Sequence, residues 1–323
     1  MVRVVSGMRP TGSLHLGHYF GVIKNWLELQ KENECFFFAA DWHALSTKYE
    51  DKLSLKDLSF DLVKTWLACG IDSEKSTIFI QSDIKEHSEL YLILNMITPV
   101  GWLERNPSYK DLISQPEFKE KNMAGFLTYP VLQAADIIMY DAQIVPIGED
   151  QKPHLELARE IVRRFHHLFD TKLFIEPKDI LTETSKLPGL DGRKMSKSYN
   201  NSIYLDDESE TIWQKVRSAK TDTNRIKKTD PGNPEVCVVW DYHKIFSDKE
   251  TQNKIYSECK AGEIGCMQCK KECASNIDKF ISPIREKKAN LSDEFVLEVI
   301  KNGEAKAKKI AKEKMQKVNK VIF

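Results

Sequence analysis

Two short segments of this 323-residue chain carry imidazole and ammonium groups at spacings suited to binding a polyphosphate. In the first, PTGSLHLGH at residues 10–18, His15 and His18 are three residues apart and would face the same side of a helical turn. Glycine lets the backbone approach a phosphate, and the free amides of a helix start favour anions. In the second, KMSKS at residues 194–198, Lys194 and Lys197 could close over a triphosphate. Together they predict phosphoryl-type chemistry, which needs positioning and charge more than a nucleophile.

Each segment has a simpler interpretation when it is taken alone. The first could be a glycine-rich turn with two surface histidines, and the second a solvated lysine loop. The first segment lacks the G-x-G-x-x-G pattern, which disfavours a nicotinamide dinucleotide site. The occurrence of both in this order, about 180 residues apart, is far more specific than either one.

The pair resembles the two signature motifs of the class I aminoacyl-tRNA synthetases, although the first motif is also shared by small nucleotidyltransferases. Three further stretches, TYPVLQAADI at 128–137, GEDQ at 148–151 and DWHA at 41–44, look like the tryptophan enzymes of bacterial type. The resemblance covers essentially the whole chain. It implies attack of the tryptophan carboxylate on the α-phosphate of ATP, with Mg²⁺ accompanying the nucleotide, and then transfer from tryptophanyl-adenylate to tRNA. It also implies a homodimer.

The resemblance assigns roles residue by residue. The residues implied in catalysis are His15, His18, Lys194 and Lys197. ATP would be contacted by Arg9, Pro10, Thr11, Gly17, His18, Gly148, Glu149, Asp150, Leu187, Lys194, Met195, Ser196, Lys197 and Ser198. The tryptophan pocket would comprise Gly7, His43, Tyr129, Gln133, Asp136 and Gln151.

Asp136 would accept the indole N–H in this scheme. Tryptophan offers one ring donor and no ring acceptor, so a carboxylate is its natural partner, and a buried carboxylate left unpaired by phenylalanine is costly. The alternative is an acid on a helix surface, but the neighbouring Leu132, Ala135 and Tyr140 are uncharged and favour burial. Gln133 stands where many bacterial members carry Met. The alternatives in function are tyrosine–tRNA ligase, the sister group with the same two loops, and a non-catalytic relative that binds tryptophan or RNA.

Five of the seven cysteines lie in one window near the C-terminal end of the sequence. Cys237, Cys259, Cys266 and Cys269 are spaced C-x21-C-x6-C-x2-C, which fits structural zinc or an iron–sulfur cluster. The alternative is a set of unrelated cytosolic thiols. The pattern resembles that of a subgroup of tryptophan enzymes that bind a [4Fe–4S] cluster, in which the first gap is one residue longer. Cys273 is either a spare ligand or a bystander.

The elements that must position these residues alternate along the chain. Apolar runs predict strands at 2–5, 35–40, 77–80 and 143–147 and helices at 16–29, 53–69, 129–140 and 153–169. This alternation predicts an α/β fold with a Rossmann-type parallel sheet. We expect a catalytic domain at 1–193 with a helical insertion and a loop region within 106–122. A mobile loop is predicted at 186–202, and a helical anticodon-binding domain at 194–323.

Formal net charge is zero, so contact with tRNA must come from local basic patches. One patch is predicted to comprise Lys215, Arg217, Lys220, Arg225, Lys227 and Lys228, and the final segment adds Lys308, Lys309, Lys312, Lys314 and Lys317. The final segment also has an apolar stripe, which we interpret as core packing. No apolar run approaches the ~20 residues of a membrane span, and no signal core is visible, so we expect a cytoplasmic protein.

Overall fold

A five-stranded parallel sheet forms the centre of the computed structural model, which describes residues 1–50, 54–114, 123–181 and 187–323. The strand order is β3-β2-β1-β4-β5. The bounds are β1 Arg3–Met8, β2 Glu34–Ala39, β3 Ser76–Ile80, β4 Ile144–Ile147 and β5 Lys178–Leu181. The order reverses between β1 and β4, and parallel α/β sheets bind ligands beyond the carboxyl ends of the strands at such a point. The expected Rossmann-type fold is confirmed.

The chain divides into two compact units, which are described separately. Unit 1 comprises residues 1–12, 25–183 and 292–323, and unit 2 comprises residues 13–24 and 184–291. A single boundary near residue 194, as expected, would place residues 13–18 in the first domain and residues 293–322 in the second. The structure instead groups residues 13–18 with unit 2 and residues 293–322 with unit 1. The functional division into catalytic and anticodon-binding parts stays a prediction.

Unit 1 holds the sheet and the helices that cover it. The helices are α2 Lys24–Leu29 (from Asn25 onward), α3 Asp41–Lys48, α4 Leu55–Cys69, α5 Glu86–Ile97, α6 Val100–Glu104, α7 Pro107–Ile113, α8 Ala124–Ile138, α9 Lys152–Leu168 and α14 Asp293–Ile322, with 3-10 turns at Gln81–Asp83 and Glu149–Gln151. On one side the Trp26 ring stacks on Phe37 at 4.2 Å between centroids and meets Trp66 edge-on. Residues 35–39 of β2, which include Phe37, are all buried, as is typical of a parallel sheet covered by helices on both faces.

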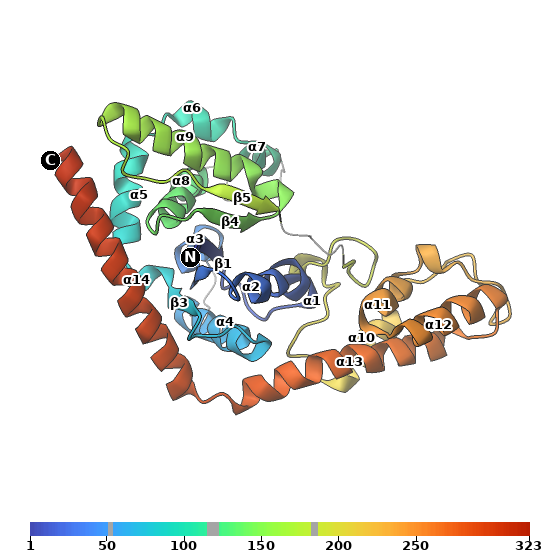
Figure 1. Ribbon diagram of the computed structural model, residues 1–323. Helices are drawn as coiled ribbons and strands as arrows, with labels where there is room; N and C mark the ends of the chain where they lie inside the picture. The colour runs from blue at the N-terminus through green and yellow to red at the C-terminus, as the bar shows by residue number, and fades with distance from the viewer. Residues whose placement is uncertain (51–53, 115–122, 182–186) are drawn as a thin grey trace. The chain divides into compact units, whose positions relative to one another are not determined.

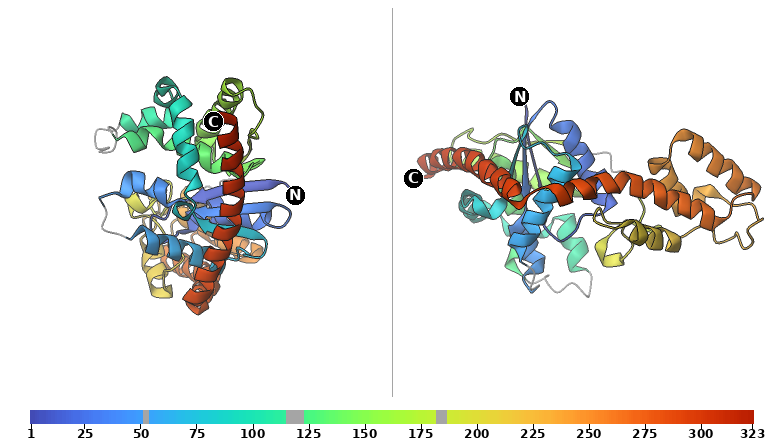
Figure 2. Two further views of the ribbon diagram at one scale, coloured as in Figure 1. Left: turned by 90° about the vertical axis from the view of Figure 1, so that its left-hand side faces the viewer. Right: turned by 90° about the horizontal axis from the view of Figure 1, so that it is seen from below.

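The long helix α14 packs against β3, α4 and α5 of unit 1, as the red helix shows in Figures 1 and 2. Gly303 makes the close approach to the sheet feasible, since a Cβ there would stand 1.8 Å from the Ile78 carbonyl oxygen. The expected apolar stripe is buried core, including Ala307, Ala311 and Met315.

Unit 2 is mostly helical. Its elements are α1 Leu16–His18, a π-helix Tyr19–Ile23, a 3-10 turn Lys197–Tyr199, α10 Ser209–Ser218, a 3-10 turn Pro234–Val236, α11 Val238–Phe246, α12 Lys249–Ala261 and α13 Cys266–Asn290. The helix α13 packs against α10 and α11 (Figure 1). The rings of Tyr19, Phe20, Phe246 and Phe280 form an aromatic cluster in which Phe20 is buried.

Several local expectations were wrong. The first strand, predicted at 2–5, continues to Met8. The helix predicted at 16–29 contains a π-helical turn at Tyr19–Ile23, a feature frequent at functional sites. The region predicted as helical at 194–323 is not helical throughout, because residues 219–233 are irregular. The loop region predicted at 106–122 is in part the helix α7 at Pro107–Ile113, and residues 115–122 of it, like Leu53 and Lys186, lie outside the described residues. No helix in the described ranges is long and apolar enough to cross a membrane.

Candidate active site

Residues 13–18 of the first predicted phosphate-binding segment lie beside the second segment within unit 2. The Leu16 amide donates to the Ile203 carbonyl at 2.9 Å and the Leu205 amide to the Leu14 carbonyl at 2.8 Å. His15 also pairs with Tyr204 in an antiparallel bridge. At Gly17 an added Cβ would lie 3.6 Å from the Met195 Cβ. The strand-like segment after KMSKS therefore holds that loop against the helix start that carries the histidines.

His15 and His18 form a close pair, with ring centroids 3.8 Å apart. Burial, followed by the Lys197 ammonium, lowers the pKa of His15 to about 4. Burial, His15 and Lys197 lower the pKa of His18 to about 3. Both imidazoles are thus neutral at pH 7 and do not repel the lysine. The shared field of Lys197 also shows that the two predicted motifs act on each other electrostatically.

The hydrogen bonds of the pair fix one tautomer and leave one atom unused. The His15 amide donates to His18 Nδ1 at 3.2 Å, so the proton of neutral His18 lies on Nε2, where it can be donated. His15 Nδ1 is buried without a hydrogen-bond partner among the described residues. Buried polar atoms normally have a partner, so an orphan of this kind fits a site that a ligand completes.

Asn201 organises the KMSKS loop. Its buried side chain accepts from the Ser196 amide at 2.8 Å and donates to Asp191 and to the Lys194 carbonyl. Gly189 is required beside it, because a Cβ there would stand 2.1 Å from Asn201 Nδ2. Lys194 is exposed, whereas Met195 is buried and anchors the segment. The loop is therefore held at its base, and its predicted mobility stays a prediction.

The predicted tryptophan-pocket residue Asp136 lies in unit 1 and is 1% exposed, as the uncharged neighbours suggested. Its carboxylate accepts from His43 Nε2 at 2.8 Å, from His87 Nδ1 at 2.6 Å and from Gln81 Nε2, which is 2.8 Å from both oxygens. Burial would raise the pKa of Asp136, but the hydrogen bonds from His43 and His87 prevail and keep it below the ordinary value. The carboxyl group therefore stays ionised.

Two of these partners, Gln81 and His87, were missed from the sequence, and so was the contact of His87 with Tyr140. His87 is fully buried, and its Nε2 lies 2.6 Å from the Tyr140 hydroxyl. The only sequence signal was the position of Gln81 directly after the third strand, where such sheets place functional side chains. His87 lies one turn later and carried no signal of its own.

Other predicted pocket residues belong to the same unit. Tyr129, Gln133 and Asp136 recur on one face of α8. At Gly7 an added Cβ would come within 2.5 Å of the Phe38 ring, which packs on Phe79 and His87. Gly7 therefore lets the Phe38 ring lie against the backbone of β1, next to the Asp136 cluster.

A second hydrogen-bond chain starts at Tyr129. Its hydroxyl lies 2.8 Å from His154 Nε2, His154 Nδ1 lies 3.1 Å from Gln151 Oε1, and Gln151 Nε2 donates to Asp150 at 2.9 Å. Burial raises the pKa of Tyr129 to about 12 and lowers that of His154 to about 4, so both stay uncharged. His154, which the sequence reasoning missed, thus links the predicted pocket residues Tyr129 and Gln151.

The remaining predicted ATP contacts are divided between the units. In unit 1, Arg9 hydrogen-bonds to the Thr47 hydroxyl, and Pro10 is buried. Glu149 and Asp150 are exposed on the turn that begins after Gly148, beyond the carboxyl end of β4. In unit 2, Leu187 is buried, Ser198 is exposed, and the Ser196 and Ser198 hydroxyls lie 2.9 Å apart.

The four predicted cysteine ligands lie in unit 2, and two of them contact Arg225. Its Nη1 lies 3.8 Å from Cys259 Sγ and 3.9 Å from Cys266 Sγ. Burial and then the other three cysteines raise the pKa of Cys269 to about 12, and burial raises that of Cys237. Across the described ranges, however, no three or more His, Cys, Asp or Glu side chains are arranged to hold a metal ion.

Cys273 is separate from this group in its environment. It is fully buried, its Sγ lies 3.9 Å from the Val239 carbonyl, and burial raises its pKa well above the ordinary value. It is a core residue, which favours the bystander over the spare ligand.

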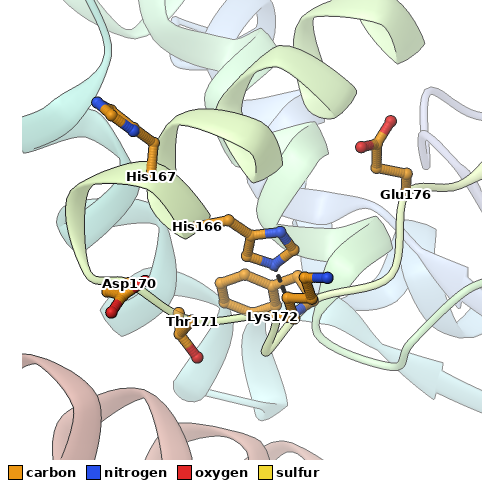
Figure 3. A pocket seen from close by; sticks show the side chains of 7 residues that line it. His166, His167, Asp170, Thr171, Lys172 and Glu176 are labelled. Carbon is orange, nitrogen blue, oxygen red and sulfur yellow. Dashed lines mark hydrogen bonds between the residues drawn. The ribbon is translucent and has the colours of Figure 1, made fainter.

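A pocket of about 720 Å³ lies at the end of α9 and is lined by His166, His167, Asp170, Thr171, Lys172, Phe174 and Glu176. Figure 3 shows the side chains that line it. None of the predicted site residues lines it. His166 Nε2 accepts from the Phe174 amide at 3.1 Å, and burial lowers the pKa of His166. The imidazole is thus used to hold the loop after α9.

The predicted basic patches are partly occupied by internal contacts. Lys215 pairs with Asp207 at 2.6 Å, and Arg225 faces the cysteines. Lys220, Lys227 and Lys228 are exposed. In the final helix Lys314 is not part of a solvated face, because it is 4% exposed and pairs with Asp141 at 2.5 Å.

Comparison with known proteins identifies the family. A family model described as class I tRNA synthetases (W and Y) matches residues 1–282. The tryptophan–tRNA ligase of Thermotoga maritima is 49% identical and that of Aquifex aeolicus 43% identical, each with 99% of both chains covered. The structure of a Campylobacter jejuni tryptophanyl-tRNA synthetase complexed with ADP and tryptophan matches with a TM-score of 0.91 at 36% identity over 99% of both chains. A tyrosyl-tRNA synthetase from Archaeoglobus fulgidus, at 22% identity and a TM-score of 0.66, shares the fold. The chain therefore belongs to the class I tRNA synthetases of the tryptophan and tyrosine type, and within them to the tryptophan–tRNA ligases.

Proposed function

We propose that this chain joins L-tryptophan to its tRNA through a tryptophanyl-adenylate formed from tryptophan and ATP. The observation that carries the proposal is the closeness of the HLGH and KMSKS segments within one unit, where an added Cβ at Gly17 would lie 3.6 Å from the Met195 Cβ. Two neutral imidazoles and a lysine act on one another there, which suits a group that must bind phosphates without an enzyme nucleophile.

His18 is proposed to donate its Nε2 proton to a phosphate oxygen, and His15 to contribute its unused Nδ1. Lys194 and Lys197 would stabilise the charge that develops on the leaving pyrophosphate. Mg²⁺ supplies further charge neutralisation when it accompanies ATP. Gly148, Glu149 and Asp150 would contact the ribose, and Arg9, Pro10, Thr11, Gly17, Leu187, Met195, Ser196 and Ser198 would complete the nucleotide contacts.

For the amino acid, we propose the pocket of Gly7, His43, Tyr129, Gln133, Asp136 and Gln151. Asp136 supports this because it is buried and held ionised by donors alone. A tyrosine substrate would bring a hydroxyl to this group rather than an indole N–H. The Campylobacter jejuni relative, whose structure is a complex with ADP and tryptophan, supports the assignment.

The test is ATP–pyrophosphate exchange measured with tryptophan, tyrosine and phenylalanine in turn. We expect exchange with tryptophan at a kcat/KM at least ~10⁴-fold above that with phenylalanine, the discrimination typical of a site with a buried polar group. Exchange with tyrosine alone would refute the assignment, and exchange with none would favour a non-catalytic relative.

For tRNA, we propose contacts through exposed lysines of unit 2, namely Lys220, Lys227 and Lys228, with residues 194–323 as the expected anticodon-binding part. Substituting all three by Ala should raise the KM for tRNA and leave pyrophosphate exchange unchanged. An unchanged KM for tRNA would contradict the contact.

We further propose a homodimer that buries an apolar strip of α5 and α6. Leu92 and Met96 lie one helical turn apart on α5, and Val100 begins α6; the three side chains are 53%, 75% and 56% exposed. Exposed large apolar side chains that gather on a surface mark interaction sites. Light scattering after gel filtration should give twice the chain mass, and Met96→Glu should shift the protein towards monomer. A wild-type monomer at micromolar concentration would refute this proposal.

We also propose that Cys237, Cys259, Cys266 and Cys269 hold a [4Fe–4S] cluster, with zinc as the alternative. The support is the C-x2-C spacing of Cys266 and Cys269 and the Arg225 guanidinium, which lies 3.8 Å from Cys259 Sγ and opposes the larger effect of burial on the pKa of that thiol. The thiols would have to close around the metal. Anaerobic purification with iron and acid-labile sulfide assays should give about four of each per chain. Stoichiometric zinc without sulfide would assign zinc, and no metal at all would refute both.

A further inference from the structure

The carboxylate of Asp136 is surrounded by three side chains that donate to it. Gln81 is fully buried, and its Oε1 accepts from the Trp42 amide at 3.2 Å, which turns its Nε2 towards Asp136. His43 contributes its Nε2 and His87 its Nδ1. An ionised carboxylate offers about four lone-pair positions, and these donors approach both of its oxygens.

Tyr140 determines which nitrogen of His87 carries the proton. Its side chain is fully buried, and its hydroxyl lies 2.6 Å from His87 Nε2. Burial raises the pKa of Tyr140 well above the ordinary value, so the hydroxyl keeps its proton and donates it. His87 Nε2 therefore accepts, and His87 Nδ1 holds the proton that is donated to Asp136.

The chain Tyr140–His87–Asp136 thus runs in one direction, with each group donating to the next. We propose that His87 and Tyr140 are positioning residues that make Asp136 an acceptor-only group, so that the site selects an amino-acid ring that donates a hydrogen bond. The inference rests on the proposed tryptophan pocket and extends it to residues that would not touch the substrate.

Gln81 can release one hydrogen-bond position on the Asp136 carboxylate to an incoming donor. Its Nε2 is shared between both Asp136 oxygens at 2.8 Å, so one lone-pair position can pass to a ring N–H while Gln81 keeps the other. A ring without a donor would leave the carboxylate underbonded in a dry site, which is costly. A ring carrying only an acceptor would face the carboxylate lone pairs directly.

Breaking this hydrogen-bond chain should change the protonation of Asp136. Without His87 the carboxylate loses a strong donor while its burial remains, and burial favours the neutral acid. A protonated Asp136 can donate as well as accept, so it no longer penalises a ring without N–H. Selectivity between rings should fall more than activity with tryptophan.

The experiment compares tryptophan with β-(3-benzothienyl)-alanine, in which sulfur replaces the ring N–H. The readout is the ratio of kcat/KM in ATP–pyrophosphate exchange for the two amino acids. We expect His87→Leu to lower this ratio about tenfold or more. His87→Asn restores an N–H near the position of Nδ1 and should keep the ratio within about threefold of wild type. Tyr140→Phe should give an intermediate fall, with the KM for ATP unchanged in all three.

The matched control is Tyr91→Phe on the same helix as His87. The Tyr91 hydroxyl lies 2.7 Å from the Thr128 hydroxyl and is outside the Asp136 cluster, so this variant should keep the wild-type ratio. If His87→Leu does not fold, Tyr140→Phe decides, since it removes one oxygen and keeps the ring that stacks on Phe36.

Three outcomes overturn the inference. The first is a wild-type ratio near one, and the second is an unchanged ratio in Tyr140→Phe, accompanied by an unchanged ratio in His87→Leu where that variant folds. The third is an equal fall in His87→Asn and His87→Leu, because the donor would then be irrelevant. A wild-type protein that does not exchange with tryptophan refutes the proposed function instead, so the two failures are distinguishable.

Discussion

Replacing Gly303 by Ala in α14 should destabilise unit 1, although alanine is the better helix former. A Cβ at this position would stand 1.8 Å from the Ile78 carbonyl oxygen and 2.6 Å from its carbon. Both atoms belong to the backbone of β3, so neither can move aside as a flexible side chain would. Relief requires the helix to move away from the sheet along a buried stripe that includes Val299, Ile300 and Ala307.

The magnitude reflects two opposing effects. Alanine in place of glycine favours a helix interior by about 1 kcal/mol. Overpacking of a filled core costs typically about 1–3 kcal/mol. The cost here should lie at the upper end of that range, because the added Cβ would collide with the backbone of β3 and not with a flexible side chain. The net loss should be about 2 kcal/mol, which lowers the Tm of a unit of this size by roughly 4–8 °C.

The assay is thermal unfolding followed by circular dichroism, with Gly101→Ala as the matched control. Gly101 lies in α6 of the same unit, and a Cβ there would have no heavy atom within 4 Å. The control should keep or raise the Tm, by reducing the freedom of the unfolded chain. A Gly303→Ala protein with a Tm equal to or above wild type would refute the packing argument.

Lys197→Ala should lower kcat of adenylate formation about 10²–10³-fold, the effect of removing one charge-stabilising group, and leave the Kd of tryptophan nearly unchanged; an unaltered rate in single-turnover assays would contradict the role. The folded-state pKa values of His15, His18 and His154 lie at about 4, 3 and 4, below the ordinary 6.5. Between these values the unfolded chain binds more protons than the folded protein, so the free energy of unfolding falls as the pH drops from 6.5 towards 4. His154→Leu should therefore show a smaller fall in urea midpoint than wild type between about pH 7.5 and about pH 4.5. An identical fall would argue against burial of His154 as a neutral ring. The KM for tRNA should rise steeply with salt while the KM for tryptophan does not, and a flat response would exclude phosphate contacts.

Much of the sheet could be predicted from the sequence because its inner strands are continuous apolar runs between helical segments. The run at Cys35–Ala39 is an example, since every residue in it is buried. The edge strand β5 could not be predicted in this way. Lys178–Leu181 is short and mostly exposed, so its sequence carries neither an apolar run nor a regular alternation.

The placement of the final helix could not be predicted either. Its apolar stripe indicated that one face is buried but not against which element. Gly303 and Lys314 decide that question through a close approach to β3 and an ion pair with Asp141. Both depend on chain segments more than a hundred residues away.

The candidate site, like the fold, could be predicted only in part from the sequence. The two phosphate-binding segments are recognisable because glycine, histidine and lysine recur at short fixed spacings. The environment of Asp136 is built from separate elements, and nothing near His87 in the sequence points to a carboxylate 49 residues away. Only the folded chain brings the donors of α3, the turn after β3 and α5 to one group on α8.

The central claim is that HLGH and KMSKS bind the phosphates of one ATP molecule. A crystal structure with tryptophan and a non-hydrolysable ATP analogue tests it most directly. We predict phosphate oxygens within hydrogen-bond distance of His18 Nε2 and Lys197 Nζ. A nucleotide bound with its phosphates away from both residues would contradict the claim.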